Sequence, residues 1–148
     1  MDDKTIHIKN IARFRGTVGE VESKIHNIMN HDDNDVINVI EQQPGMAGIT
    51  LKQHRNEYLK GFPIHWEYSN KDKESRALPF ATAVESGTVS MSKASWNDEL
   101  IKELIRFNPN DDSFDDIVDS CSLGFNFLNR SRRSISMNLF NRVNRNSR

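Results

Sequence analysis

Hydrophobic positions follow two kinds of spacing along the chain, and the alternation between them predicts the order of secondary structure. Apolar residues in alternation, or in short β-branched runs, indicate strands over residues 5–14, 35–41, 62–68 and 88–91. Apolar residues three and four apart indicate five helices between and after these strands, over residues 17–29, 46–59, 71–86, 95–107 and 113–128. Because strands and helices alternate, an α/β layered sheet is the expected architecture.

The second predicted strand, DVINVIE over residues 35–41, is β-branched and nearly all apolar. This composition is typical of a strand that is buried on both faces, so we expect it to be central in the sheet. Its last residue is Glu41, and the end of a central strand is where α/β proteins place ligands and catalytic groups. Taken alone, Glu41 fits a solvated residue at the mouth of a loop better than a catalytic group.

Three residues mark expected helix boundaries or distortions. Thr17, followed three positions later by Glu20, has the spacing of a capping box, and Ser95 is the expected cap of the fourth helix. Pro79 lies inside the third predicted helix, where it is expected to kink or interrupt it.

Length and composition limit the fold more than the function. A chain of 148 residues is long enough for one domain with a hydrophobic core, and 36% hydrophobic with 28% charged residues fits either an enzyme or a binding module. The single cysteine, Cys121, excludes an internal disulfide, and no Cys/His spacing indicates zinc. No signal peptide or membrane-length apolar run is present, so we expect an intracellular protein without membrane contact.

Charge divides the chain into an acidic body and a basic tail. Residues 130–148 contain six arginines and no acid, which leaves 14 basic and 21 acidic residues in residues 1–129. We therefore expect a domain over 1–129 and a basic, disordered tail over 130–148. A solvated end and an arm that contacts phosphates are equally consistent with this tail, and a disordered arm can order on nucleic acid.

An acidic cluster opens the last predicted helix in the run FDDIVDS. Carboxylates in a first turn are favoured by the helix dipole without any function. Asp116 and Asp119 are expected to share a face while Asp115 points elsewhere by about 100°, so not all three can ligate one ion.

Metal chemistry is suggested by the combination of Glu41 at a strand end with acids at a helix start. Hard oxygen ligands suit Mg²⁺ or Mn²⁺, and two such ions about 4 Å apart can activate water and stabilise the leaving oxygen in phosphodiester cleavage. Other site types have less support, because no Ser/His/Asp order, Walker A motif or Gly-rich dinucleotide loop is present.

Four ordered blocks of sequence then resemble a known family. They are IKNIARFRGTVGEVESKI, NVIEQQPGMAG, KDKESRALPFATAVESGTVSM and WNDELIKELIRFNPNDDSFDDIVDSCSLGFNFL, and with their surroundings they cover residues 5–128. In this order they resemble the nuclease domain of phage large terminase subunits. The resemblance implies a ribonuclease H-like mixed sheet flanked by helices, and an endonuclease that hydrolyses DNA with two divalent ions, Mg²⁺ or Mn²⁺.

The resemblance also implies roles for single residues. Catalysis and metal binding would fall to Glu41, Asp115 and Asp116, with Asp116 the first choice of the two aspartates. DNA contacts would come from Lys73 and Arg76, and from the start of the basic tail at Arg130, Arg132 and Arg133. For Lys73 and Arg76, an ordinary solvated helix face is the competing interpretation. Trp96 would be a core residue.

Two departures from the family pattern bear on activity. Phe114 stands where the family often has His, and the family's first catalytic aspartate lies on a strand that precedes the first one matched here. We therefore expect that first strand, and the ATPase half of a large terminase, to be missing from this chain. Asp2 and Asp3 belong to no apolar strand and are poor substitutes for the missing acid.

These expectations place the protein in genome packaging. The implied partners are double-stranded DNA, a polypeptide carrying the ATPase or the first strand, the portal and the small terminase subunit, in the cytoplasm of an infected bacterium. Two alternatives share the fold: a non-catalytic module that binds DNA or terminase, and a resolvase-like nuclease. The first would lack metal-dependent cleavage, and the second fits the four blocks less well.

Overall fold

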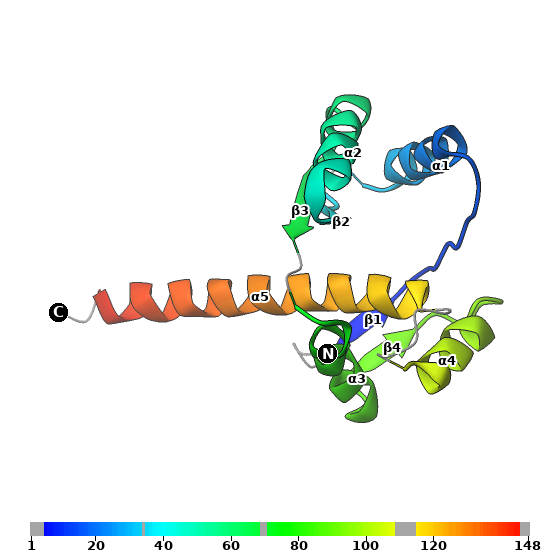
Figure 1. Cartoon of the computed structure of the whole chain (residues 1–148). Coiled ribbons are helices and arrows are strands. Elements are labelled where there is room, and N and C mark those ends of the chain that lie inside the picture. The colour runs from blue at the N-terminus through cyan, green and yellow to red at the C-terminus, as the bar shows by residue number, and fades with distance from the viewer. Residues whose placement is uncertain (1–4, 34, 69–70, 109–114, 146–148) are drawn as a thin grey trace. The chain divides into compact units, whose positions relative to one another are not determined.

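The chain alternates short strands with helices in the computed structural model, which describes residues 5–33, 35–68, 71–108 and 115–145, with side chains to residue 131 (Figure 1). The elements are β1 Ile6–Ile8, α1 Val18–His31, β2 Asn38–Gln42, α2 Gly45–Tyr58, β3 Ile64–Tyr68, α3 Lys73–Glu85, β4 Val89–Met91, α4 Asn97–Arg106 and α5 Asp116–Arg145. The expected α/β class is confirmed.

The chain divides into two compact units, each described here by itself. The terminal unit consists of Met1–Ile11 and Asp72–Arg148, and the middle unit of Ala12–Lys71. Each unit contains one pair of parallel strands, β1 with β4 in the terminal unit and β2 with β3 in the middle unit.

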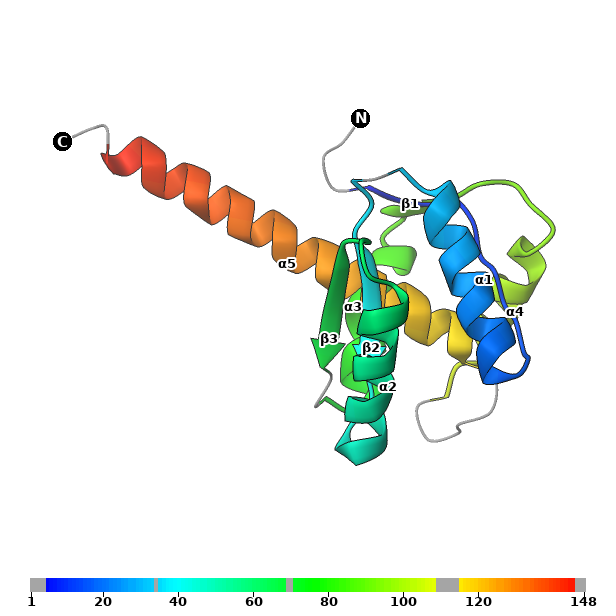
Figure 2. The ribbon, with the colours of Figure 1, turned by 90° about the horizontal axis from the view of Figure 1, so that it is seen from above.

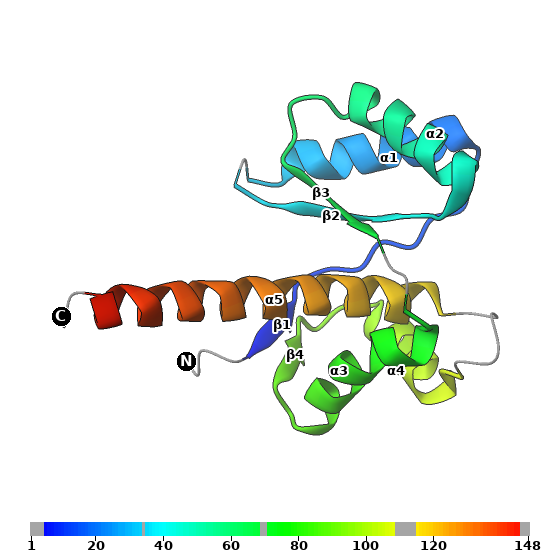
Figure 3. The same cartoon turned by 60° about the vertical axis from the view of Figure 1, so that its left-hand side comes forward.

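The core of the terminal unit lies where α3 and α5 pack together against the strand pair (Figure 3). Its centre is formed by Phe80 and Ala83 from α3 and Phe125 from α5, with the two phenyl rings 5.8 Å apart. Ile6 and Val89, which face each other across β1 and β4, pack against this centre. The hydrophobic face of α3 thus holds α5 in place along its first turns.

Helix α3 continues through Pro79, so the predicted interruption is wrong. Proline removes one backbone donor from a helix, but the burial of Ala77 before it and of Phe80 and Ala83 after it holds the segment helical. The helix ends at Glu85 with Ser86 as its C-cap, and Gly87 follows with a φ of 70°, the left-handed conformation that glycine adopts without strain after a helix.

Helices α4 and α5 begin later than the sequence predicts. Ser95 is not the cap of α4, because the cap position is Trp96 and the Asn97 side chain folds back to accept a 2.6 Å hydrogen bond from the Ala94 backbone N–H. Trp96 itself is half-buried. Helix α5 starts at Asp116 and runs to Arg145, well beyond the expected end at Leu128, so most of the basic segment 130–148 has a helical backbone.

The middle unit is built on a β2–α2–β3 crossover (Figure 2). Its first helix begins as predicted: the Thr17 hydroxyl accepts from the Glu20 backbone N–H, and the Glu20 carboxylate accepts from the Thr17 backbone N–H at 2.7 Å. The Thr17 backbone N–H and the Thr17 hydroxyl both donate to the Glu20 carboxylate, and these two bonds lower its pKa. A buried ion pair of 2.8 Å between Glu22 and Arg55 then joins α1 to α2.

The expectation that residues 35–41 form a central strand buried on both faces is wrong for the part of the chain that the structure describes. Strand β2 pairs with β3 alone, and its residues are half-buried except for the exposed Glu41. Val36 and Ile37 precede the strand and remain 37% and 54% exposed. The β-branched composition predicted extended backbone correctly, but burial depends on neighbours that composition does not specify.

Candidate active site

The acidic start of α5 places its three aspartates in different environments. Asp115 precedes the helix and is only 7% exposed, Asp119 lies one turn later and is partly buried, and Asp116 is exposed. Asp115 and Asp119 both contact α3, so the prediction that Asp115 points away from Asp119 is wrong, whereas the shared face of Asp116 and Asp119 stays a prediction. Asp115 occupies the position before the first helical residue, so the angular spacing of a regular helix does not apply to its side chain.

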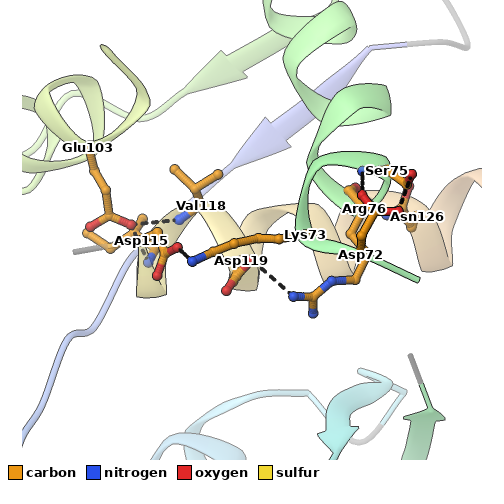
Figure 4. Close-up of polar contacts among 10 residues, drawn as sticks. Asp72, Lys73, Ser75, Arg76, Glu103, Asp115, Val118, Asp119 and Asn126 are labelled. Carbon is orange, nitrogen blue, oxygen red and sulfur yellow. Dashed lines mark hydrogen bonds and ion pairs between the residues drawn. The ribbon is translucent and has the colours of Figure 1, made fainter. Parts of the chain in front are cut away.

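Two basic residues of α3 face these acids (Figure 4). The Lys73 ammonium makes an ion pair with the Asp115 carboxylate, and the Arg76 guanidinium lies 3.8 Å from the Asp119 carboxylate. The Lys73 and Asp115 side chains are 14% and 10% exposed, so this pair is well shielded from water. The two positions expected to contact DNA therefore lie beside the predicted metal-binding segment and neutralise its charge.

Local hydrogen bonds hold α3 in this orientation. The Asp72 carboxylate caps the helix by accepting from the Ser75 backbone N–H and hydroxyl, both at 2.8 Å, and these bonds lower the pKa of Asp72. At the other side of the cluster, the Asn126 amide donates to the Arg76 carbonyl at 2.9 Å and links α5 to α3. The cluster is thus fixed at both of its helices.

Helix α4 contributes a residue that the sequence reasoning missed. Glu103 is 5% exposed, and its Oε1 atom accepts hydrogen bonds from the backbone N–H groups of Ile117 at 2.6 Å and Val118 at 2.9 Å. The signal for it was present, because Glu103 lies within the apolar stripe of its helix, between Leu100 and Leu104. An acid at such a position needs a buried partner.

Glu41 lies in the middle unit, one residue before the end of β2 and opposite Glu67 of β3. Its position near a strand end agrees with the sequence prediction. Glu67 in turn contacts the His65 ring at 3.2 Å.

The carboxylates at the start of α5 are of the kind that binds a hard divalent cation, but in the described part of the chain too few of them converge to hold one. Asp115, Asp116 and Asp119 offer carboxylate oxygens, which Mg²⁺ and Mn²⁺ prefer. Among the described residues, however, no group of three or more His, Cys, Asp or Glu side chains converges to hold an ion. A complete site would therefore need Asp115 to exchange Lys73 for the cation and would need ligands from another segment.

Of the remaining predicted positions, the structure describes the side chain of Arg130 but not those of the others. Arg130 has an exposed side chain on α5. The side chains of Arg132 and Arg133, and the residues Asp2, Asp3 and Phe114, lie outside the described residues. Within the described part of the chain, no helix is both long enough and apolar enough to span a membrane.

Comparison with known proteins gives one match. No curated protein and no solved structure matches the chain significantly. The family of terminase RNaseH-like domains matches residues 2–127, which cover the middle unit, most of the terminal unit and every acidic residue discussed above. The match confirms the ribonuclease H-like fold expected from the four sequence blocks, and the chain belongs to the terminase RNaseH-like domain family.

Proposed function

We propose that this chain is a divalent-metal-dependent endonuclease domain of a phage DNA-packaging terminase large subunit. The observation that carries the proposal is the family match over residues 2–127. The acidic start of α5, packed against Lys73 and Arg76 of α3, supports it because nucleases of this kind need both carboxylates for metal and cations near the phosphate.

The ligands in this proposal are Glu41, Asp115 and Asp116, which would hold two Mg²⁺ or Mn²⁺ ions. Bound ions of this kind supply an activated water and stabilise the leaving oxygen of a phosphodiester. The carboxylate of Asp116 is exposed to solvent, while the buried carboxylate of Asp115 is oriented by Lys73. Lys73 and Arg76 would then have two roles, as counter-ions of Asp115 and Asp119 and as DNA contacts.

Double-stranded DNA is the proposed substrate, and Arg130, Arg132 and Arg133 are its proposed backbone contacts. The further partners are a terminase ATPase polypeptide, the portal and the small terminase subunit, in the cytoplasm of an infected bacterium. These assignments follow from the role of terminases in packaging and rest on the family.

Plasmid cleavage in Mg²⁺ and in Mn²⁺ tests the proposal. We expect slow cleavage, faster in Mn²⁺, that Glu41→Ala, Asp115→Ala and Asp116→Ala each reduce by at least about a hundredfold. Asp98→Ala is the matched control, because Asp98 is an exposed acid in the first turn of α4 and should leave cleavage unchanged. Cleavage that survives all three substitutions would refute the site.

A non-catalytic DNA-binding module is the second candidate, and one observation favours it. Asp115 and Asp119 already face Lys73 and Arg76, so the charge that would attract a cation is balanced within the protein. This candidate predicts DNA binding that is equal in EDTA and in Mn²⁺, without cleavage. The nuclease predicts tighter binding and cutting when Mn²⁺ is added.

A further inference from the structure

Asp115 occupies the position at which an aspartate normally caps a helix. It directly precedes α5, and its backbone carbonyl accepts the first helical hydrogen bond, 2.8 Å from the Asp119 backbone N–H. An aspartate there ordinarily turns its side chain back to accept from the second or third N–H of the helix. In α5 these N–H groups belong to Ile117 and Val118.

Both N–H groups are instead bound by Glu103 of α4. One carboxylate oxygen, Oε1, lies 2.6 Å from the Ile117 nitrogen and 2.9 Å from the Val118 nitrogen (Figure 4). The Asp115 carboxylate points away from its own helix, toward Lys73 of α3. Glu103 therefore caps α5 in place of Asp115, and the Asp115 carboxylate faces Lys73 of α3.

We propose that Glu103 is a positioning residue that caps α5 in place of Asp115 and so keeps the Asp115 carboxylate directed into the acidic and basic cluster. The use of that carboxylate as a metal ligand rests on the proposed function. The exchange of caps, in which Glu103 takes the capping role of Asp115 at α5, does not. Glu103 acts on the site through the backbone of α5.

The geometry of α4 explains how Glu103 can do this. Leu100 is 2% exposed and lies one turn before it on the same face, so the helix is anchored where the carboxylate leaves it. The positive end of the α5 dipole favours a carboxylate at this point. Without that acceptor, the two buried N–H groups would be unsatisfied, and Asp115 holds the capping position from which a side chain can accept from them.

The proposal makes a specific prediction for amide hydrogen exchange at Ile117 and Val118. Either acid should be able to protect these amides, so protection should survive in Asp115→Ala and in Glu103→Ala. In the double variant neither acid remains, and exchange of both amides should accelerate by about tenfold or more. Loss of protection in Glu103→Ala alone, or loss of the fold, would show that Asp115 cannot replace Glu103 and would overturn the proposal.

Manganese binding supplies the second readout. In Glu103→Ala the Asp115 carboxylate is drawn back onto its own helix, so Mn²⁺ affinity should fall by about tenfold or more. Glu103→Gln retains an oxygen acceptor and should keep both amide protection and near-normal affinity, and Asp98→Ala is again the control. An affinity unchanged in Glu103→Ala would overturn the positioning role.

The two readouts separate this proposal from the proposed function. If the wild-type chain binds no Mn²⁺ but shows the predicted pattern of amide protection, the nuclease fails and the exchange of caps is supported. If the chain binds Mn²⁺ and cuts DNA but Glu103→Ala loses amide protection, the nuclease stands and the exchange of caps is refuted.

Discussion

The Lys73 ammonium of α3 and the Asp115 carboxylate before α5 form an ion pair in which the two side chains are 14% and 10% exposed. This pair connects the two helices that form the core of the terminal unit, and it joins a predicted DNA contact to a predicted metal ligand. The stability of the unit and the charge of the candidate site therefore depend on the same contact.

Replacing Lys73 with methionine should destabilise the terminal unit. The substitution keeps most of the side-chain volume but leaves a buried carboxylate without its counter-ion, which costs about 3 kcal/mol of unfolding free energy. Urea unfolding at neutral pH measures the loss. Arg76→Met is the matched control, since the Arg76–Asp119 pair is longer at 3.8 Å and more exposed, and its loss should cost about 1 kcal/mol or less. Equal losses in the two variants would contradict this ranking.

Gly48→Ala should destabilise the turn that follows β2 and Glu41. A Cβ atom at Gly48 would lie 1.9 Å from the Gln43 backbone carbonyl oxygen, and because that oxygen belongs to the main chain the backbone itself must move. We expect a loss of about 1–3 kcal/mol, measured by urea unfolding. Gly19→Ala tests the reasoning in the same unit: it lies in α1 with no atom within 4 Å of the added Cβ, so it should stabilise the chain by about 0.5–1 kcal/mol.

The free thiol of Cys121 should report on the packing of α5. Burial, together with the smaller effect of the nearby negative charge of Glu103, raises its pKa to about 11. At pH 8 the folded chain should therefore react with iodoacetamide about a hundredfold more slowly than the same chain in urea. Similar rates in the two conditions would mean that the first turns of α5 are not packed as described.

The parts of the fold that sequence predicted well are those determined by neighbours along the chain. Thr17 and Glu20 form their capping box because both partners lie within four residues, and the spacing alone specifies the bonds. Glu41 was likewise placed near the end of its strand by local pattern. Strand and helix order followed from the same kind of local periodicity.

The parts that sequence missed depend on residues far apart. Glu103 reaches backbone groups 14 and 15 positions later, and Lys73 reaches an acid of another helix, so no local spacing predicts either contact. The orientation of Asp115 was predicted wrongly for this reason, because its side chain is directed by two other helices and not by its own. Tertiary contacts of this kind decide which acids of FDDIVDS face the cluster.

The last prediction concerns the basic end of the chain and separates a DNA-binding arm from a solvated helix. Removing residues 130–148 deletes six arginines and no acid, while the packed residues Cys121 and Phe125 remain. If several of these arginines touch phosphates, the slope of log binding constant against log salt should decrease by about 0.9 for each lost contact. Fluorescence anisotropy on a short duplex, between about 50 and 200 mM salt, measures the slope. Substitution of all six arginines by glutamine is the matched control, because it removes the charge and keeps the length of α5. If both variants lose the same slope, the arginines themselves contact DNA; a slope unchanged from the full chain in both would leave 130–148 as a solvated extension.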